Sequence, residues 1–500
     1  MNERLYESLK CIFKPQSVAI VGASNSPMRW GYHTLRNMIE AGFRHRLYPV
    51  NPNDKEVQGI PCYPGITQIP AEVDLAVIVV NTTQVADVIA QCIDKKVKGG
   101  IVITAGFAET GQKGAQLQKE VAQDAKQAGF YFIGPNCCGI WSSAGNVNTL
   151  FNKKMHPPKG SVAFVSQSGT LGEYFFNGTQ KNGFGASKFV SCGNQACVSL
   201  TDVLEFLGDE PETRVITAYI EDVGNGRRFL EVARKVAAQK PLLAFKAGST
   251  PEAARAARSH TAAMAGDDAI FEAACRQAGV LRCDNFMDMF AIAGALSHQP
   301  LPKGNRVAVI SPGGGFCVTT AEACTRLGLE LPEMTAEAQN RLRAEMNPFA
   351  PPPVNPIDSI GRKNSQAYLN IIEIVAAEGY IDGIILTPRL DRLDRSWRPE
   401  NMIKKVKLAE ATAAIAEKYN KPLICASEHE LEGPIFEIFK RRHIPFFDNP
   451  FDCAKVMAGM VQYAKFSVKN LFGEAEALDE SGETGVAHEK LMKRLRKKIG

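Results

Sequence analysis

The hydrophobic pattern of the chain repeats one theme: a short apolar run, then glycine or asparagine, then a helical stretch with one apolar face. Apolar runs that do not alternate with polar residues are typical of strands buried on both faces of a sheet. Strands that alternate with helical segments predict βαβ units and parallel sheets. The alternation continues from about residue 17 to about residue 465, so we expect an α/β fold throughout.

Two polar, proline-containing linkers, residues 152–160 and 299–305, divide this pattern into three series. The predicted strands are 17–21, 47–50, 75–80, 100–104 and 130–133 in the first series, 161–165, 186–190, 215–220 and 242–246 in the second, and 307–311, 383–387, 422–426 and 445–448 in the third. We therefore expect three consecutive parallel-sheet domains, residues 1–150, 151–299 and 300–466. A charged tail, residues 467–500, is expected to be loosely held.

The composition agrees with a large globular chain. It has 500 residues, of which 45% are hydrophobic and 22% charged, so the classes of disordered and fibrous proteins are excluded. At about 150 residues per domain, this length corresponds to about three domains. The net charge of +5 is mild, and the lysines and arginines are spread along the chain except for a cluster at 490–498. We therefore expect no nucleic-acid partner.

Targeting and metal-binding signals are missing from the sequence. The polar start, residues 1–15, has no apolar core of a signal peptide, and no apolar run is long enough to cross a membrane. The 13 cysteines are scattered, and neither C-x-x-C nor H-E-x-x-H occurs. We expect a cytoplasmic protein with reduced thiols, no metal site and no membrane contact.

The turn after the first predicted strand is the first candidate for binding chemistry. It carries Gly22, Ala23, Ser24 and Asn25. Small residues between a strand and a helix let the backbone approach a phosphate, and the helix N-terminus supplies N–H donors. The turn is not G-x-G-x-x-G, however, and a tight turn without a ligand is the alternative interpretation.

The end of the second predicted strand narrows the ligand class. A nicotinamide-dinucleotide site would carry an acidic residue there for the ribose, but the chain has Asn51-Pro52-Asn53, followed at a short distance by Lys55. Lysine suits a phosphorylated ribose better than a free one. We therefore expect Asn53 and Lys55 to face a nucleotide with an additional phosphate, either coenzyme A or NADP.

Further strand ends of the first domain also carry small polar residues, and ligands of open parallel sheets bind at the carboxyl ends of strands. Several such ends that open on one crevice are a stronger indication of a ligand site than any single one. The residues concerned are Asn81, Thr104, Ala105, Gly106, Phe107 and Asn136.

The second domain opens with a hydroxyl- and glycine-rich helix start, which is suited to bind an anion. Its residues are Ser166, Gln167, Ser168, Gly169 and Thr170. A serine-nucleophile turn of the G-x-S-x-G type is the rival interpretation, but that motif requires glycine where this chain has Ser166.

His260 lies in a loop of small residues between alanine-rich helices, with no metal-ligand spacing around it. A single histidine is usually structural, but small neighbours leave room for a group that must be reached from two sides. Glu221 closes a predicted strand of the same domain, and a carboxylate there could accept the imidazole N–H and fix its tautomer. The alternative interpretation is that Glu221 is an exposed acidic residue at the strand end or a helix cap.

Taken together, these segments resemble the NDP-forming acyl-CoA synthetases, that is, the α subunit of ADP-forming acetate–CoA ligases, which is related to the α subunit of succinyl-CoA synthetase. The resemblance covers about residues 10–465. It rests on SHTAAMAG around His260 and KAGSTPEAARAA before it, and on GPNCCGI, SQSGTLG and NPID elsewhere.

The resemblance implies a Rossmann-like CoA-binding domain followed by two flavodoxin-like domains. It implies that the turn at Gly22 meets the CoA phosphates, that Lys55 meets the nucleotide end, and that residues 104–107 with Asn136 line the path to the thioester. It makes His260 the transiently phosphorylated residue, Glu221 its partner, and residues 166–170 the phosphate site. One departure is Ala262, where the acetyl-CoA enzymes usually have glycine.

The reaction implied by the resemblance is acyl-CoA plus phosphate and ADP giving acid, CoA and ATP, reversibly, through an acyl phosphate and phosphohistidine. The family also needs an ATP-grasp domain, and no segment here resembles one. The glycine-rich turn at 311–315 lacks the G-K-[ST] of a P-loop, so we expect a structural or interface role for it. We therefore expect an oligomer in which ATP or ADP, with Mg²⁺, binds an ATP-grasp β subunit.

Two alternatives from other classes stay open: a non-catalytic CoA or acyl-CoA sensor with the same fold, and an NADP-dependent oxidoreductase. The presence of both His260 and Glu221 favours the enzyme. The carboxylic acid and the choice between ADP and GDP are also open, because the pocket residues lie on loops and the nucleotide site is expected on another chain.

Overall fold

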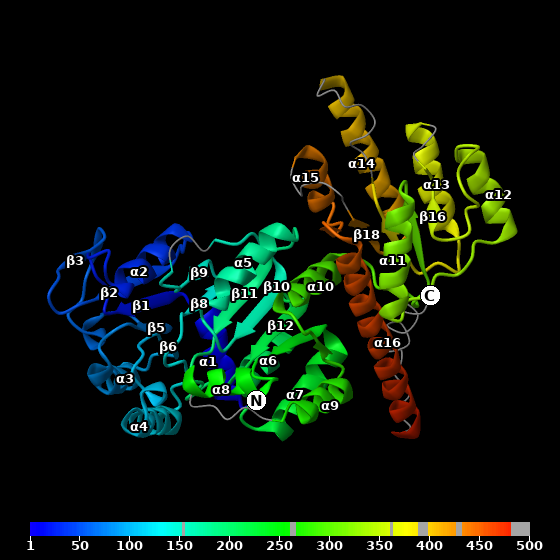
Figure 1. Cartoon of the computed structure of the whole chain (residues 1–500). Helices are drawn as coiled ribbons and strands as arrows, with labels where there is room; N and C mark the ends of the chain where they lie inside the picture. Colours follow the sequence, from blue (N-terminus) through cyan, green and yellow to red (C-terminus); the bar gives the residue numbers. More distant parts are fainter. Residues whose placement is uncertain (153–155, 261–266, 361–363, 389–398, 427–432, 482–500) are drawn as a thin grey trace. The chain divides into compact units, whose positions relative to one another are not determined.

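The computed structural model describes the chain except residues 153–155, 261–266, 361–363, 389–398, 427–432 and 482–500 (Figure 1). The description of residues 256–260, 399–402 and 470–481 is limited to the backbone. Two compact units are formed, one by residues 1–180 with 185–289 and the other by residues 181–184 with 290–500.

The first sheet is parallel, with the strand order β2-β1-β5-β6-β7. Its strands are β1 (Ser17–Val21), β2 (Arg46–Val50), β5 (Leu75–Ile78), β6 (Gly99–Val102) and β7 (Phe132–Ile133). The helices are α1 (Glu3–Phe13), α2 (Trp30–Glu40), α3 (Val85–Asp94) and α4 (Gln112–Ala128), with short 3₁₀ turns at Ile66–Gln68, Thr82–Gln84 and Ala108–Thr110. A small antiparallel pair, β3 (Glu56–Val57) and β4 (Ile60–Pro61), was not expected.

Helix α2 covers one face of this sheet, and α3 and α4 cover the other (Figure 1). Apart from the edge strand β2, whose first residue is exposed, the strands are buried without alternation, as their apolar sequences predict, and β1 and β5 are buried at every position. Alternate side chains such as Ala19 and Val21 pack with Val88 of α3 and Val121 of α4 in one apolar core.

The second sheet belongs to the same unit and has the order β14-β13-β12-β10-β11-β8-β9. The parallel strands are β10 (Lys159–Ser166), β11 (Ala186–Ser191), β12 (Val215–Ile220), β13 (Leu242–Lys246) and β14 (Leu281–Arg282). The antiparallel strands are β8 (Ile140–Ser142) and β9 (Val147–Asn148). The helices are α5 (Leu171–Lys181), α6 (Leu200–Asp209), α7 (Gly226–Gln239), α8 (Pro251–His260), α9 (Asp268–Ala278) and α10 (Phe286–His298), which belongs to the second unit from residue 290 on.

Strands β8 and β9 show that the boundary between the first two sheets differs from the expected position near residue 150. Residues 140–142 pair with β11, so the chain joins the second sheet before the polar linker. These strands are only three and two residues long, and their pairing depends on contacts that local sequence does not encode.

The second unit contains the third sheet, which is parallel with the order β16-β15-β17-β18-β19. Its strands are β15 (Val307–Ser311), β16 (Ile357–Asp358), β17 (Gly383–Leu386), β18 (Leu423–Ala426) and β19 (Phe446–Phe447). Its helices are α11 (Gly314–Arg326), α12 (Ala336–Glu345), α13 (Ser365–Ala377), α14 (Pro399–Tyr419), α15 (Pro434–Arg441) and α16 (Pro450–Ser481).

The first part of the expected loose tail is helical. Helix α16 continues through residues 467–481, and residues 482–500 lie outside the described part of the chain. The segment is rich in alanine, glutamate and leucine and has no proline, so helix propensity outweighs its charge. Among the described helices, α16 included, none combines the length and the apolar character needed to cross a membrane.

All three sheets share one topology. When the parallel strands of each sheet are numbered along the chain, the order is second, first, third, fourth, fifth. The first sheet, expected to be Rossmann-like, thus has the same order as the two expected to be flavodoxin-like. In this arrangement the chain changes direction next to the first strand, and ligands bind at the carboxyl ends of the strands beside that point.

A buried charge cluster ties α1 to the second sheet. Lys188 of β11 has a fully buried side chain, and its ammonium lies 3.2 Å from a Glu210 oxygen and 3.7 Å from a Glu212 oxygen. Lys14, which follows α1, lies 3.6 Å and 3.1 Å from the same two carboxylates. A buried ammonium is stable only when its charge is compensated, so this cluster holds the N-terminal segment in place.

Replacing Glu210 by Gln should lower the free energy of unfolding by about 3 kcal/mol, because Lys188 loses its nearer counter-charge inside the protein. Chemical or thermal unfolding followed by circular dichroism measures this change. Glu7→Gln is the matched control, since Glu7 pairs with Lys10 on the exposed face of α1. Its effect should stay within about 0.5 kcal/mol.

Acid should abolish the difference between Glu210→Gln and the unmodified chain. Burial alone would raise the pKa of Glu210, but the ammonium groups of Lys188 and Lys14 lower it below its ordinary value of 4.5. A carboxylate with a lowered pKa stabilises the fold above its unfolded-state pKa, and this contribution disappears as the pH falls through the folded-state value. A pH-independent difference, or an equal loss in Glu7→Gln, would contradict the assignment.

Candidate functional site

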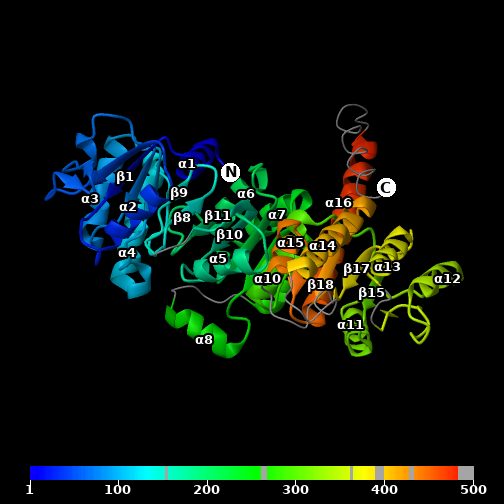
Figure 2. The ribbon, with the colours of Figure 1, turned by 90° about the horizontal axis from the view of Figure 1, so that it is seen from above.

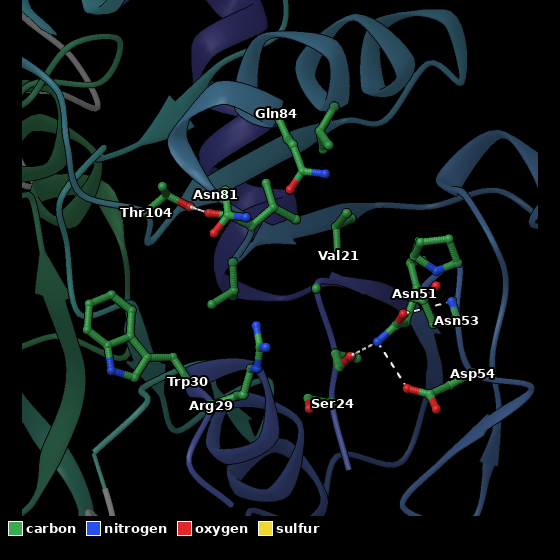
Figure 3. A pocket seen from close by; sticks show the side chains of 18 of the residues that line it. Val21, Ser24, Arg29, Trp30, Asn51, Asn53, Asp54, Asn81, Gln84 and Thr104 are labelled. Carbon is green, nitrogen blue, oxygen red and sulfur yellow. Dashed lines mark hydrogen bonds between the residues drawn. The ribbon is translucent and has the colours of Figure 1, made fainter. Parts of the chain in front are cut away.

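A pocket of about 1210 Å³ opens at the carboxyl edge of the first sheet, where the strand order reverses. The residues after β1, β2, β5 and β6 line it, and the start of α2 closes one side (Figure 3). The pocket therefore lies at the position where doubly wound sheets bind their ligands.

The turn after β1 brings helix α2 very close to the strand ends. Gly22 has φ +95°, and a Cβ there would lie 2.1 Å from the Val79 carbonyl oxygen. A Cβ on Gly31 would lie 2.0 Å from the Gly22 carbonyl oxygen. Only glycine allows both contacts, which seat the N-terminus of α2 against the floor of the pocket.

Polar side chains organise the end of the pocket at β2. The Asn51 side-chain amide donates to the Ala23 carbonyl oxygen at 2.9 Å and to the Asp54 carboxylate at 3.0 Å, and the backbone N–H of Asn53 donates to Asn51 at 3.0 Å (Figure 3). Asn25 donates to the Glu56 carbonyl oxygen and so fixes the turn against β3. This end presents amide and carboxylate groups suited to the hydroxyls of a ribose.

The opposite end of the pocket lies at β5 and β6. Thr104 donates to the Val80 carbonyl oxygen at 2.8 Å, and Thr82 donates to the Ala105 carbonyl oxygen at 2.6 Å. Trp30 lies at this end in Figure 3, and its ring stacks on Phe151 with centroids 4.6 Å apart. The pocket thus runs from an amide-rich end to an aromatic end.

Eight of the twelve residues predicted to bind CoA line this pocket, and four do not. Those that line it are Gly22, Ala23, Ser24, Asn25, Asn53, Asn81, Thr104 and Ala105. Lys55 is not among the lining residues. The N–H groups of Gly106 and Phe107 donate to the Glu109 carboxylate, and the Phe107 side chain lies in the core. Asn136 donates to Asn194 of the second domain instead.

Several lining residues were missed by the sequence reasoning, among them Arg29, Trp30 and Asp54. Arg29 is the N-cap residue of α2, and its guanidinium points into the middle of the pocket in Figure 3. The sequence signal for two of these residues is a cationic and an aromatic residue, Arg29 and Trp30, immediately before Gly31. Asp54 supplies the carboxylate that the end of the second strand was thought to lack, one residue beyond Asn53.

The anion-binding turn expected in the second domain lies between β10 and α5. Ser166 is buried, accepts from the Ser168 N–H at 3.1 Å and donates to the Ser168 carbonyl oxygen at 2.6 Å. The Ser168 and Thr170 hydroxyls lie 3.2 Å apart. Gly169 has the Cys138 sulfur so close that a Cβ would lie 2.1 Å from it. The turn therefore rests on the loop that follows β7 and exposes Thr170 at the helix start.

The glycine-rich turn of the second unit, residues 311–315, differs from the turn at 166–170 because a carboxylate lies beside its helix start. Gly313 is the N-cap residue of α11, and a Cβ on Gly314 would lie 2.9 Å from an Asp358 carboxylate oxygen. A carboxylate at a helix start is unfavourable for a bound phosphate. This geometry supports the expectation of a structural or interface role for residues 311–315.

Glu221 and His260 are described to different extents. Glu221 follows β12 and is only 9% exposed. His260 is the last residue of α8, its side chain is outside the described part of the structure, and so is Ala262. Figure 2 shows α8 standing away from the second sheet, and its first residues, 251–255, are exposed or half-buried. The pairing of His260 with Glu221 stays a prediction.

Two family models match this chain. The model described as "CoA binding domain" matches residues 16–142, which contain every residue that lines the pocket. The model described as "Succinyl-CoA ligase like flavodoxin domain" matches residues 159–296 and covers the turn at 166–170, Glu221 and His260.

Curated relatives resemble the chain over most of its length. It is 37% identical to the α subunit of ADP-forming acetate–CoA ligase II from Pyrococcus furiosus, over 91% of this chain and 98% of that protein. It is 32% identical to ADP-forming 4-hydroxybutyrate–CoA ligase from Nitrosopumilus maritimus, over 91% of this chain but 64% of that longer protein.

Among solved structures, the ADP- and phosphate-bound acetyl-CoA synthetase 1 from Candidatus Korarchaeum cryptofilum matches with a TM-score of 0.83 and 31% identity. The match covers 93% of this chain and 98% of that one. The chain therefore belongs to the family of ADP-forming acetate–CoA ligases, as a CoA-binding subunit of the α type.

Proposed function

We propose that this chain is the CoA-binding and phosphoryl-carrying subunit of an ADP-forming acid–CoA ligase. The overall reaction converts acyl-CoA, phosphate and ADP into a carboxylic acid, CoA and ATP, reversibly. The observation that carries the proposal is the large pocket at the reversal point of the first sheet, which lies wholly within the segment matched by the CoA-binding model.

The chemistry of the pocket fits CoA. Arg29 and the N-terminus of α2 supply positive charge and N–H donors for the diphosphate. Asn53 and Asp54 supply polar groups for the ribose at the β2 end. Thr104 and Trp30 lie at the other end, where the pantetheine arm would lead toward the thioester.

The first chemical step takes place where the thioester meets phosphate. A phosphate oxygen attacks the carbonyl carbon, the C–S bond breaks, and CoA leaves as the thiol after taking up a proton. The product is an acyl phosphate. The turn at 166–170 is suited to hold the phosphate, because the start of α5 offers N–H groups and Thr170 offers a hydroxyl.

The second step transfers the phosphoryl group to His260. An imidazole nitrogen attacks the phosphorus, the bond from phosphorus to the carboxylate oxygen breaks, and the acid is released. Glu221 would accept the other imidazole N–H and orient the ring. ADP then takes the phosphoryl group from phosphohistidine and becomes ATP, which restores the histidine.

The nucleotide step is assigned to a partner subunit. The chain spans nearly all of a relative that is named a subunit, but only 64% of a longer relative that is named as the ligase itself. We expect ADP, with Mg²⁺, to bind an ATP-grasp β subunit in a hetero-oligomer. Phosphohistidine would then carry the phosphoryl group between the two binding sites.

Arg29→Ala should weaken CoA binding by about tenfold, because one charge-assisted hydrogen bond to the diphosphate is lost. Isothermal titration with CoA measures the effect, and Arg36→Ala is the matched control on the same helix, since Arg36 pairs with Glu40. Equal loss in Arg36→Ala, or tighter binding of NADPH than of CoA, would contradict the proposal.

His260→Ala should abolish formation of acid-labile, base-stable phosphate on the protein. The chain is incubated with radioactive phosphate and either acetyl-CoA or 4-hydroxybutyryl-CoA, and the label is located by peptide mapping. His45→Ala, which changes an exposed histidine of the first domain, should label normally. If the unmodified chain binds CoA but takes up no label from either acyl-CoA, the non-catalytic sensor becomes the better interpretation.

A further inference from the structure

Lys246, the last residue of β13, is a buried cation without a counter-ion among the described residues. It is only 5% exposed. Its ammonium donates to two backbone carbonyl oxygens, that of Glu221 at 2.8 Å and that of Ala247 at 2.7 Å, and it makes no ion pair with a described carboxylate. Burying an ammonium that has no ion-pair partner is unfavourable, so the position of Lys246 needs an explanation.

The side chain of Gln167 binds the turn after β12, which contains Glu221 and Asp222. Its side-chain oxygen accepts from the N–H of Glu221 at 2.5 Å and from the N–H of Asp222 at 3.1 Å, and its side-chain nitrogen donates to the Asp222 carbonyl oxygen at 2.9 Å. These three bonds direct Gln167 toward Glu221, although the sequence placed it in the phosphate site. Gln167 follows β10 and Lys246 ends β13, so two strands that flank β12 converge on the turn after β12.

Lys246 and Gln167 together form a clamp on the turn after β12. The fold itself does not require this clamp. The three sheets share one strand order, so equivalent positions can be compared. The fourth strand ends in Val102 in the first sheet and in Ala426 in the third, both buried and apolar. The residue after the first strand is Gly22 in the first sheet and Pro312 in the third. Neither has a side chain that could form a hydrogen bond to a neighbouring turn. The clamp is specific to the sheet that carries the anion-binding turn and α8.

We propose that Lys246 and Gln167 are positioning residues for phosphoryl transfer, which hold Glu221 in place and let its carboxylate coexist with an incoming phosphate. This inference rests on the proposed function. The turn carries two carboxylates, Glu221 and Asp222, which repel a phosphate dianion. The buried charge of Lys246 offsets this repulsion beneath the turn, while Gln167 prevents the backbone from moving away.

The surroundings of the Lys246 ammonium act on its charged form in opposite directions. Burial lowers the pKa of the Lys246 ammonium from its ordinary value of 10.5, while Asp222, Asp268 and Glu221 favour the charged form and Arg282 opposes it. An anion bound nearby would relieve the cost of keeping this charge inside the protein. Phosphate binding and the protonated state of Lys246 should therefore stabilise each other.

Phosphohistidine labelling of variants tests the inference. Lys246→Met should slow labelling by acyl-CoA and phosphate at least about tenfold, with CoA affinity unchanged, because one favourable charge is removed from the site. Lys246→Arg keeps the charge and should restore most of the rate. Gln167→Glu should also slow labelling, since it loses the donor to the Asp222 carbonyl oxygen and adds a negative charge to the turn.

Lys240→Met is the matched control. Lys240 follows α7 in the same domain, and its ammonium also donates to two backbone carbonyl oxygens, those of Leu207 and Glu210. Lys240 lies two residues before the start of β13, however, whereas Lys246 ends that strand at the carboxyl edge. Its removal should affect stability but leave labelling within about twofold of the unmodified chain, because the charge at the carboxyl edge is untouched.

The outcomes separate this inference from the proposed function. If the unmodified chain is not labelled, the proposed function fails. If it is labelled and Lys246→Met is labelled as fast as Lys240→Met, the clamp is merely structural and the inference is wrong. Circular dichroism checks the folding of each variant; should Lys246→Met not fold, normal labelling of folded Gln167→Glu would overturn the inference, and slowed labelling would support it.

Discussion

The constraint on which the candidate sites depend is the reversal of strand order beside the first strand of each sheet. Parallel strands end at one edge, and the loops on the two sides of the reversal diverge and leave a crevice. In the first sheet the crevice becomes the large pocket, because Gly22 and Gly31 bring the start of α2 to its floor. In the second sheet the same edge holds the turn at 166–170 and Glu221.

The sequence predicts the class of the fold and the main strands well, because the strands are long apolar runs buried on both faces. It misses the short strands, such as β8, β14 and β16, since two or three residues have no periodicity to detect. The same limit applies to the site. Gly22 follows a predicted strand and Thr104 ends one, so both were predicted, whereas Arg29 lies at a helix start, where only the path of the chain brings it over the pocket.

Side chains that were assigned from motifs alone proved harder to place. Gln167 stands in a hydroxyl-rich turn and was predicted to face phosphate, yet its amide is bonded to the residues after another strand. Phe107 follows a strand end like Thr104, but a 3₁₀ turn directs it into the core. A motif indicates which backbone lies at the edge of the sheet, whereas hydrogen-bond partners decide which side chains reach a ligand.

The route of the chain through β8 and β9 has a consequence for dissecting the protein. Because residues 140–148 leave the first sheet and complete the edge of the second, the polar stretch that follows is not a tether between independent parts. A proteolytic cut at 156–158 would leave two fragments that are still joined by the pairing of β8 with β11. A fragment ending near residue 150 would present an unpaired strand edge to solvent and would be prone to self-association.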